Sequence, residues 1–146
     1  MSEPEKLESV RRMWSSWLRG CVAAANEYSN GLKQVTLVLY GTVPRPRRYR
    51  FRRALDLVEV MERGLQKLME RRCISGLEYR RTYGAIMDLR DKLRRGEPPS
   101  FEELEAFLSP VHDFARIAEE KGIYREFELP PEARDVLALL SRLKKR

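Results

Sequence analysis

The chain has 146 residues, 29 Lys and Arg against 22 Asp and Glu, and a formal net charge of +7. This length suits one domain with a buried core, and no run of about 18 apolar residues predicts a membrane span. The acidic start, Met1–Glu5, lacks the apolar stretch of a secretory signal. We therefore expect a single domain over residues 1–146, located in the cytoplasm and without a membrane partner.

The charge is distributed unevenly along the chain. Residues 1–96 carry 21 basic and 11 acidic side chains, residues 97–135 carry 4 and 11, and residues 136–146 carry 4 and none. Such a division predicts one surface for a polyanion and another, acidic one for a protein neighbour, unless folding mixes the two.

The cysteines and amides bear on the environment of the protein. Cys21 and Cys73 lie outside any CxxC motif, and we expect two small buried apolar residues in a reducing cytosol, with a disulfide as the alternative. Only four residues are Asn or Gln. Together with abundant Arg and Glu this is typical of heat-adapted proteins, although a GC-rich genome would also enrich Arg.

The first 43 residues predict one long helix followed by a second apolar element. Ser2-x-x-Glu5 is a capping box, and Asn30-Gly31 is expected to end the helix because both residues tolerate positive φ. Residues 32–43 fit either a helix or a strand, and we favour a helix. The apolar residues at helical spacing in the first element are Leu7, Val10, Trp14, Trp17, Leu18, Cys21 and Tyr28.

Residues 44–53 form the most basic stretch of the chain, with six arginines, two aromatic residues and no acid. A guanidinium group is always charged, forks onto phosphate oxygens and stacks on bases, and interleaved aromatic residues suit unpaired bases. The stretch therefore predicts a nucleic-acid contact, with a solvated basic loop ahead of a helix as the alternative. Its candidate residues are Arg45, Arg47, Arg48, Tyr49, Arg50, Phe51, Arg52 and Arg53.

The rest of the chain predicts a succession of helices. Apolar residues at three- and four-residue steps indicate a helix over 49–72, and capping boxes at Ser75-x-x-Glu78 and Ser100-x-x-Glu103 begin the next two. We expect 123–129 to be extended, and the whole chain to form an all-α, single-domain bundle of six or seven helices. Further breaks and starts are expected at Gly96 with Pro98-Pro99, Ser109-Pro110, Lys121-Gly122 and Pro130-Pro131.

Four more arginines flank the expected turn at Ser75-Gly76 and form a second candidate nucleic-acid site: Arg71, Arg72, Arg80 and Arg81. The same region is the one place where the helix–turn–helix of a transcriptional regulator could lie, although its second helix offers no Asn or Gln to read bases. The cations in the last turns of the helix that begins after Ser75 complement the helix dipole, and this role requires no ligand. They are Arg90, Lys92, Arg94 and Arg95.

No constellation of residues predicts catalysis or a cofactor. The one histidine, His112, is adjacent to Asp113, but neighbouring helix residues point about 100° apart and do not form a dyad. The sequence has no HExxH, paired CxxC or histidine cluster for a metal, and no glycine-rich loop for a nucleotide. We therefore expect a protein that is not an enzyme and that takes no cofactor and no metal.

The stretch Ser29-Asn30-Gly31-Leu32-Lys33-Gln34-Val35-Thr36-Leu37-Val38-Leu39 resembles the Asn-Gly-Leu-x-Gln segment, leading into an apolar helix, of the small helical subunit of type III-B CRISPR effector complexes. The closing stretch Leu137-Ala138-Leu139-Leu140-Ser141-Arg142-Leu143-Lys144-Lys145 is similar to that family's Leu-rich, basic last helix. Residues 44–53 have no counterpart there. The resemblance implies a non-catalytic bundle that stacks along the interior of an antiviral effector and contacts the guide–target duplex or the displaced strand.

The leading hypothesis is a non-catalytic, α-helical subunit that binds nucleic acid within a larger ribonucleoprotein or DNA-processing assembly. RNA or single-stranded DNA is expected before duplex DNA, other subunits are expected to dock through the acidic 97–135 stretch, and self-association is left open. The rival hypotheses are a helix–turn–helix-like regulator and a protein-binding adaptor. The adaptor would dock its partner through the acidic stretch and through apolar residues such as Trp14, Trp17 and Phe101. For Trp14 and Trp17, core packing is the first interpretation and a subunit interface the second.

Overall fold

The computed structural model describes the backbone of residues 3–122 and 130–145, and the side chains in these ranges except those of residues 3 and 7–15. This part of the chain is helical and contains no strand, which confirms the expected all-α bundle. Its helices are α1 (Glu3–Tyr40), α2 (Arg47–Glu70), α3 (Gly76–Arg94), α4 (Phe101–Ala106), α5 (Ser109–Glu120) and α6 (Pro131–Lys144). The expected capping residue Ser2 and the expected extended stretch 123–129 lie outside the described residues.

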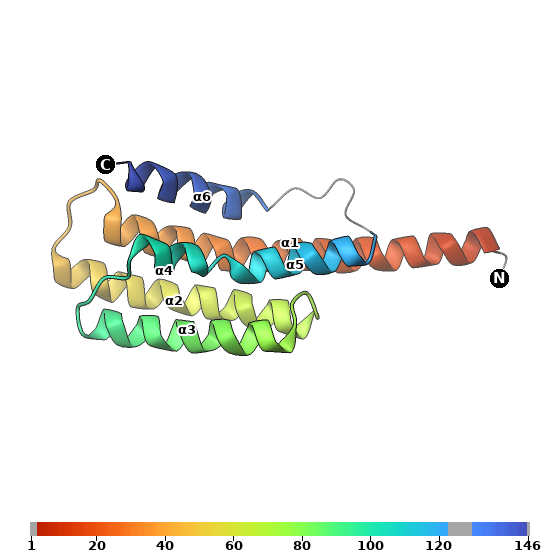
Figure 1. Cartoon of the computed structure of the whole chain (residues 1–146), viewed down its shortest axis with the longest axis horizontal. Coiled ribbons are helices and arrows are strands. Elements are labelled where there is room, and N and C mark those ends of the chain that lie inside the picture. The colour runs from red at the N-terminus through yellow and green to blue at the C-terminus, as the bar shows by residue number, and fades with distance from the viewer. Residues whose placement is uncertain (1–2, 123–129, 146) are drawn as a thin grey trace.

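The bundle is organised around α1, the longest helix (Figure 1). α2 and α3 form an antiparallel hairpin beside it, α6 packs along it, and the short helices α4 and α5 follow one another between α6 and α3. At one end of the molecule the first turns of α1 extend past the other helices. The opposite end brings together the end of α1, the 41–46 connection, the start of α2 and the end of α3.

α1 does not end at Asn30-Gly31 as expected but continues to Tyr40, so residues 32–40 are helical. Gly31 serves a close helix contact, because a Cβ there would lie 2.9 Å from the backbone nitrogen of Met61 in α2. Gly64 of α2 makes a similar contact, since its Cβ would lie 2.6 Å from the backbone nitrogen of Tyr28. The two glycines let the helices meet backbone to backbone. This contact overrides the local tendency of Asn-Gly to end a helix.

Cys21 and Cys73 are joined by a disulfide, and the expectation of two separate thiols was wrong. The two residues are 52 positions apart in sequence, but the packing of α1 against the turn after α2 brings their Cα atoms to 5.7 Å, a separation that a disulfide can span. Trp17 supports the same junction, because its Nε1 donates a hydrogen bond to the backbone oxygen of Arg71 at 3.0 Å.

The local signals for helix ends are confirmed where the structure describes them. The Ser75 and Ser100 hydroxyls accept hydrogen bonds from the backbone nitrogens of Glu78 and Glu103, both at 3.1 Å, as capping boxes require. Gly96 follows α3 with a φ of 73°, a conformation that favours glycine. These residues set where α3 and α4 begin and where the chain turns between them.

The core is centred on α1 and α2. Tyr28 of α1 is fully buried, and its hydroxyl donates to the backbone oxygen of Phe107 at 2.5 Å. Burial therefore raises the pKa of Tyr28 well above its ordinary value. Trp17 packs edge-on against Phe114, with 5.8 Å between the ring centroids. Over residues 3–122 and 130–145, no helix carries an apolar stretch long enough to cross a bilayer.

Candidate nucleic-acid interface

The arginine-rich stretch is not a loop ahead of a helix, because its last seven residues form the first two turns of α2. α2 begins at Arg47, two residues before the expected start. Pro46 precedes it in an extended conformation, with φ −56° and ψ 142°, and accepts a hydrogen bond from the Arg50 amide at 3.1 Å. The helix fixes the spacing of the guanidinium groups. We call residues 45–53 the arginine-rich end.

The six guanidinium groups of the arginine-rich end form no ion pair with any residue that the structure describes. Five of these side chains are exposed and Arg50 is half-buried. Some cations elsewhere are paired, such as Arg90 with Glu62 and Lys92 with Glu103 at 2.8 Å. Single exposed arginines such as Arg63 and Arg80 are also unpaired among the described residues, so this end differs by holding six unpaired guanidinium groups within nine residues. The arginine-rich end therefore carries positive charge that nearby carboxylates do not offset, and such a surface attracts polyanions.

Each aromatic residue of this end is covered by the arginine one turn before it. The guanidinium carbon of Arg45 lies 5.8 Å from the centre of the Tyr49 ring, and that of Arg47 lies 5.2 Å from the centre of Phe51. Arg47 also donates to the backbone oxygen of Gly96, which ties the start of α2 to the end of α3. The ring faces expected to meet bases are thus shared with guanidinium groups, which are themselves flat and stack on bases.

Two hollows flank the pair formed by Arg47 and Phe51. The α2–α3 hollow has a volume of about 490 Å³ and an apolar floor of Phe51, Leu55 and Leu93. Four arginines also line it, Arg47, Arg48, Arg52 and Arg94, of which Arg94 is paired with Asp91 at 3.7 Å. The α1–α2 hollow has a volume of about 350 Å³. It is lined by Arg45, Arg47, Arg50 and Phe51 together with Leu39, Tyr40 and Pro98.

The arginine-rich end is therefore completed by residues that sequence reasoning did not assign to it. Leu39 and Tyr40 close α1, and Pro98 follows α3, so only the fold brings them to the start of α2. Arg94 was assigned to the dipole of its helix, yet it also lines the α2–α3 hollow. The Gly-Glu-Pro-Pro break predicted a turn at this point but gave no sign of what the turn would contact.

Arg50 differs from its neighbours because part of its charged head is enclosed. Its Nε atom is shielded from solvent and has no hydrogen-bond partner in the described part of the chain. A buried donor without an acceptor is unfavourable, and the cost is larger for a charged group. Arg50 also lines the α1–α2 hollow, but its Nε is turned away from solvent.

The second candidate group of arginines lies at the far end of α2 and does not join the first. About 35 Å of helix separates Arg48 from Arg71. Arg81 pairs with the buried Glu78 at 2.7 Å, while the other three arginines of the group are exposed. The adjoining helices α2 and α3 run side by side (Figure 1). They lack the steep crossing of a helix–turn–helix.

The acidic 97–135 stretch is largely engaged with cations from the rest of the chain. Seven of its described carboxylates form ion pairs. Five of them pair with cations outside the stretch, so folding mixes charges that are separate in the sequence: Glu97 with Arg95, Glu103 with Lys92, Glu105 with Lys144, and Glu132 and Asp135 with Lys33. Asp113 and Glu120 pair with Arg116 within the stretch. Fewer acids are left to dock a protein partner than the sequence suggested.

His112 and Asp113 do not act together in the structure. His112 is exposed on α5, whereas the Asp113 carboxylate accepts hydrogen bonds from the Ser75 backbone nitrogen at 2.9 Å and from Arg116 at 2.8 Å. Asp113 thus holds the turn before α3 against α5. This role is structural and was not apparent from the sequence.

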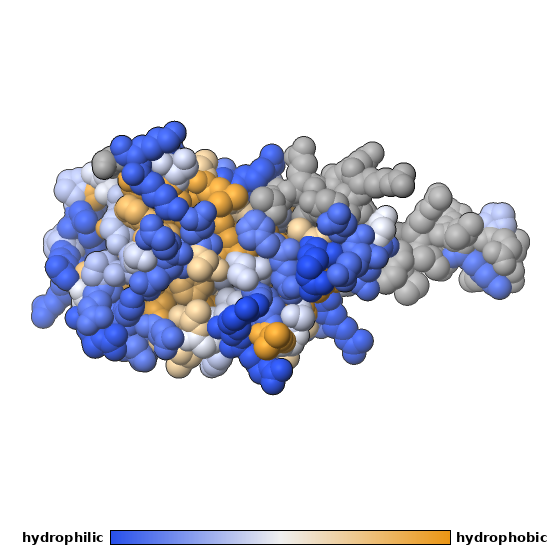
Figure 2. Space-filling model, viewed as in Figure 1, coloured by the Kyte–Doolittle hydropathy of each residue, from blue (hydrophilic) through white to orange (hydrophobic). Residues whose placement is uncertain are grey.

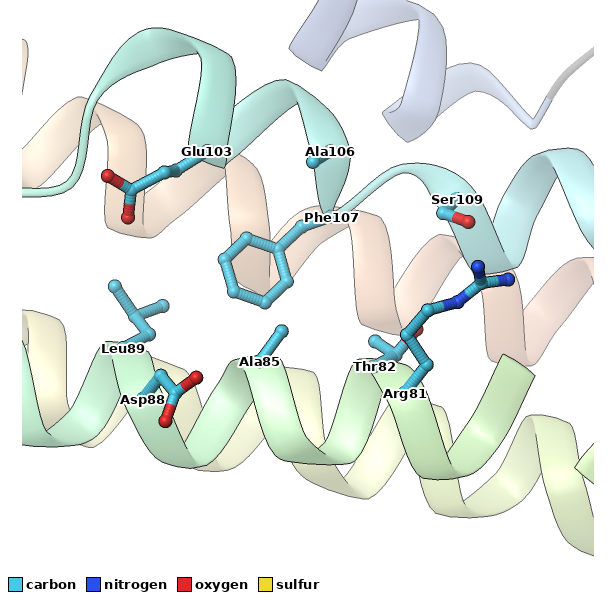
Figure 3. Close-up of a pocket in the computed structure, with 9 residues that line it drawn as sticks. All are labelled: Arg81, Thr82, Ala85, Asp88, Leu89, Glu103, Ala106, Phe107 and Ser109. Atoms are coloured by element: carbon cyan, nitrogen blue, oxygen red, sulfur yellow. The ribbon is translucent and has the colours of Figure 1, made fainter. Parts of the chain in front are cut away.

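A third hollow, of about 400 Å³, lies between α3 and α4 (Figure 3). Phe107 points across it toward Ala85, and Arg81 reaches toward Ser109 at one end. The guanidinium group of Arg81 forms an ion pair with Glu78, and the carboxylate of Glu103 forms one with Lys92. This hollow therefore has none of the unpaired guanidinium groups that mark the arginine-rich end.

Comparisons with known proteins identify no relative: no protein-family model, curated protein or solved structure matches this chain. The resemblance to the small subunit of type III-B CRISPR effectors stays a prediction.

Proposed function

We propose that this protein is a non-catalytic, α-helical subunit that binds nucleic acid through its arginine-rich end, within a larger ribonucleoprotein or DNA-processing assembly. The observation that supports this function is the set of six guanidinium groups without a carboxylate partner among the described residues. Hydrophilic side chains cover most of the molecular face that includes this end (Figure 2). Such a group of arginines is well suited to bind phosphate oxygens, which accept paired hydrogen bonds from guanidinium groups.

The rival adaptor function has less support, because the aromatic residues expected to dock a protein are used inside the bundle. Trp17 packs against Phe114 and donates to the backbone of Arg71. Phe101 packs edge-on against Tyr40 at 4.7 Å between ring centroids. The Trp14 side chain lies outside the described residues.

An antiviral effector of the type III-B kind is one assembly that such a subunit would fit, and it would place the protein in the cytoplasm. The disulfide bears on this proposal, because cytosolic proteins rarely keep disulfides except in hyperthermophiles. A heat-adapted source, which the composition favours, would reconcile the disulfide with that location.

Salt-dependent binding tests the function. Replacing Arg47, Arg48, Arg50 and Arg52 with Ala should weaken the binding of a labelled single-stranded oligonucleotide and flatten the plot of log K against log salt. Each phosphate contact contributes about 0.7 to the slope for a single strand. The slope should therefore fall by up to about 3 units, measured by fluorescence anisotropy.

The matched control removes four exposed cations that lie away from the arginine-rich end: Arg19, Arg63, Lys67 and Arg116. Its net charge changes by the same amount, so general attraction falls equally in both variants. Equal slopes for the two variants, or no measurable affinity of the wild-type protein for RNA or DNA, would overturn the proposed function.

A further inference from the structure

The two hollows at the arginine-rich end differ in chemistry, although they share Arg47 and Phe51. The α1–α2 hollow is lined by three arginines, Arg45, Arg47 and Arg50, none of which has a carboxylate partner among the described residues. A phosphate group offers several strong acceptor oxygens, and guanidinium binds it with paired hydrogen bonds. The α1–α2 hollow therefore suits a backbone phosphate.

The α2–α3 hollow suits a flat, partly apolar group. Its floor is formed by Phe51, Leu55 and Leu93, and guanidinium groups stand around its rim. Its volume of about 490 Å³ falls in the range of clefts that hold small ring-bearing ligands. An unpaired base could lie on this floor while its polar edge meets Arg48 or Arg94.

We propose that the arginine-rich end binds a single strand that crosses the Arg47–Phe51 pair, with a phosphate in the α1–α2 hollow and the adjoining unpaired base in the α2–α3 hollow. This inference rests on the proposed nucleic-acid function and adds the class of ligand. A base stacked inside a duplex cannot enter the hollow without unpairing. The site therefore selects single-stranded over double-stranded nucleic acid.

The test compares three ligands of equal length by fluorescence anisotropy: a 12-nucleotide single strand of DNA, the same strand with abasic residues throughout, and its duplex. The abasic strand keeps the phosphates and lacks the bases. The wild-type protein should bind the normal strand about tenfold more tightly than the abasic strand, since stacking of a single base is worth this much. The duplex should also bind about tenfold more weakly than the normal strand.

Two variants assign the effect to the hollows. Arg50→Lys keeps the positive charge but loses the planar pair of guanidinium donors. It should weaken the binding of both the normal and the abasic strand by about tenfold. Arg63→Lys is the matched control, because Arg63 is exposed on the same helix, lies outside the arginine-rich end and lines neither hollow. It should stay within about twofold of wild type. Phe51→Leu should reduce the preference for the normal over the abasic strand.

Equal affinity of the wild-type protein for all three ligands would overturn the base in the α2–α3 hollow and leave the proposed function intact. Equal affinity of Arg50→Lys and Arg63→Lys would overturn the phosphate in the α1–α2 hollow. Absence of binding to every ligand would overturn both this inference and the proposed function. If Phe51→Leu does not fold by circular dichroism, the comparison of normal and abasic strands on the wild-type protein decides alone.

Discussion

Replacing Gly64 with Ala should destabilise the protein, although alanine normally favours a helix. An added Cβ would lie 2.6 Å from the backbone nitrogen, 2.7 Å from the Cα and 2.8 Å from the Cβ of Tyr28. None of these atoms can rotate away, so α1 and α2 must move apart. This movement would disturb the hydrogen bond from the Tyr28 hydroxyl to the backbone oxygen of Phe107. Overpacking of this kind costs up to about 3 kcal/mol. Alanine regains about 1 kcal/mol of helix propensity, which leaves a net loss of about 2 kcal/mol.

Gly84→Ala provides the matched control. Gly84 lies in α3, and a Cβ there would meet no atom within 4 Å. This substitution should therefore stabilise the protein by about 0.5–1 kcal/mol. Urea unfolding followed by circular dichroism gives both values, provided the m-value is unchanged. If Gly64→Ala proves as stable as Gly84→Ala, the helices do not meet backbone to backbone and the account of α1 is wrong.

Two further predictions concern the disulfide and one ion pair. Reduction of the Cys21–Cys73 bond, which spans 52 positions, should lower the free energy of unfolding by about 4 kcal/mol through loop entropy; identical urea midpoints with and without dithiothreitol would contradict this. Hydrogen bonding from Lys92 lowers the pKa of Glu103 in the folded protein. The stability that this pair contributes is therefore fully present above the ordinary glutamate pKa of about 4.3. It is lost as the pH falls through the lower pKa of the folded state. Because the pair is exposed, the loss should be at most about 1 kcal/mol, and Glu103→Gln should remove this part of the pH dependence.

The features that were predictable from the sequence are those that depend on neighbouring residues. Ser75 and Ser100 cap their helices through residues three positions later, so a short pattern is sufficient to find them. Gly31 was misread because its role depends on Met61 of another helix. The disulfide was missed for the same reason, since spacing in sequence does not report distance in space.

The candidate site likewise combines features that depend on neighbouring residues with features that depend on distant ones. The density of arginine in residues 45–53 marked the start of α2 as basic, because charge is a property of the residues themselves. Whether those arginines would be paired with carboxylates depended on which acids folding brought near them. The α1–α2 hollow beside Phe51 depends on Tyr40 and Pro98, which no local pattern connects to it.

The covalent link between α1 and the turn after α2 lies at the opposite end of the α2–α3 hairpin from the arginine-rich end. The disulfide and the residues that would meet a ligand are thus separated by the length of α2. Residues 45–53 can then change during evolution, or be exchanged by design, without disturbing the cross-link or the glycine contacts. The bundle would serve as a scaffold on which recognition can be reprogrammed from one end.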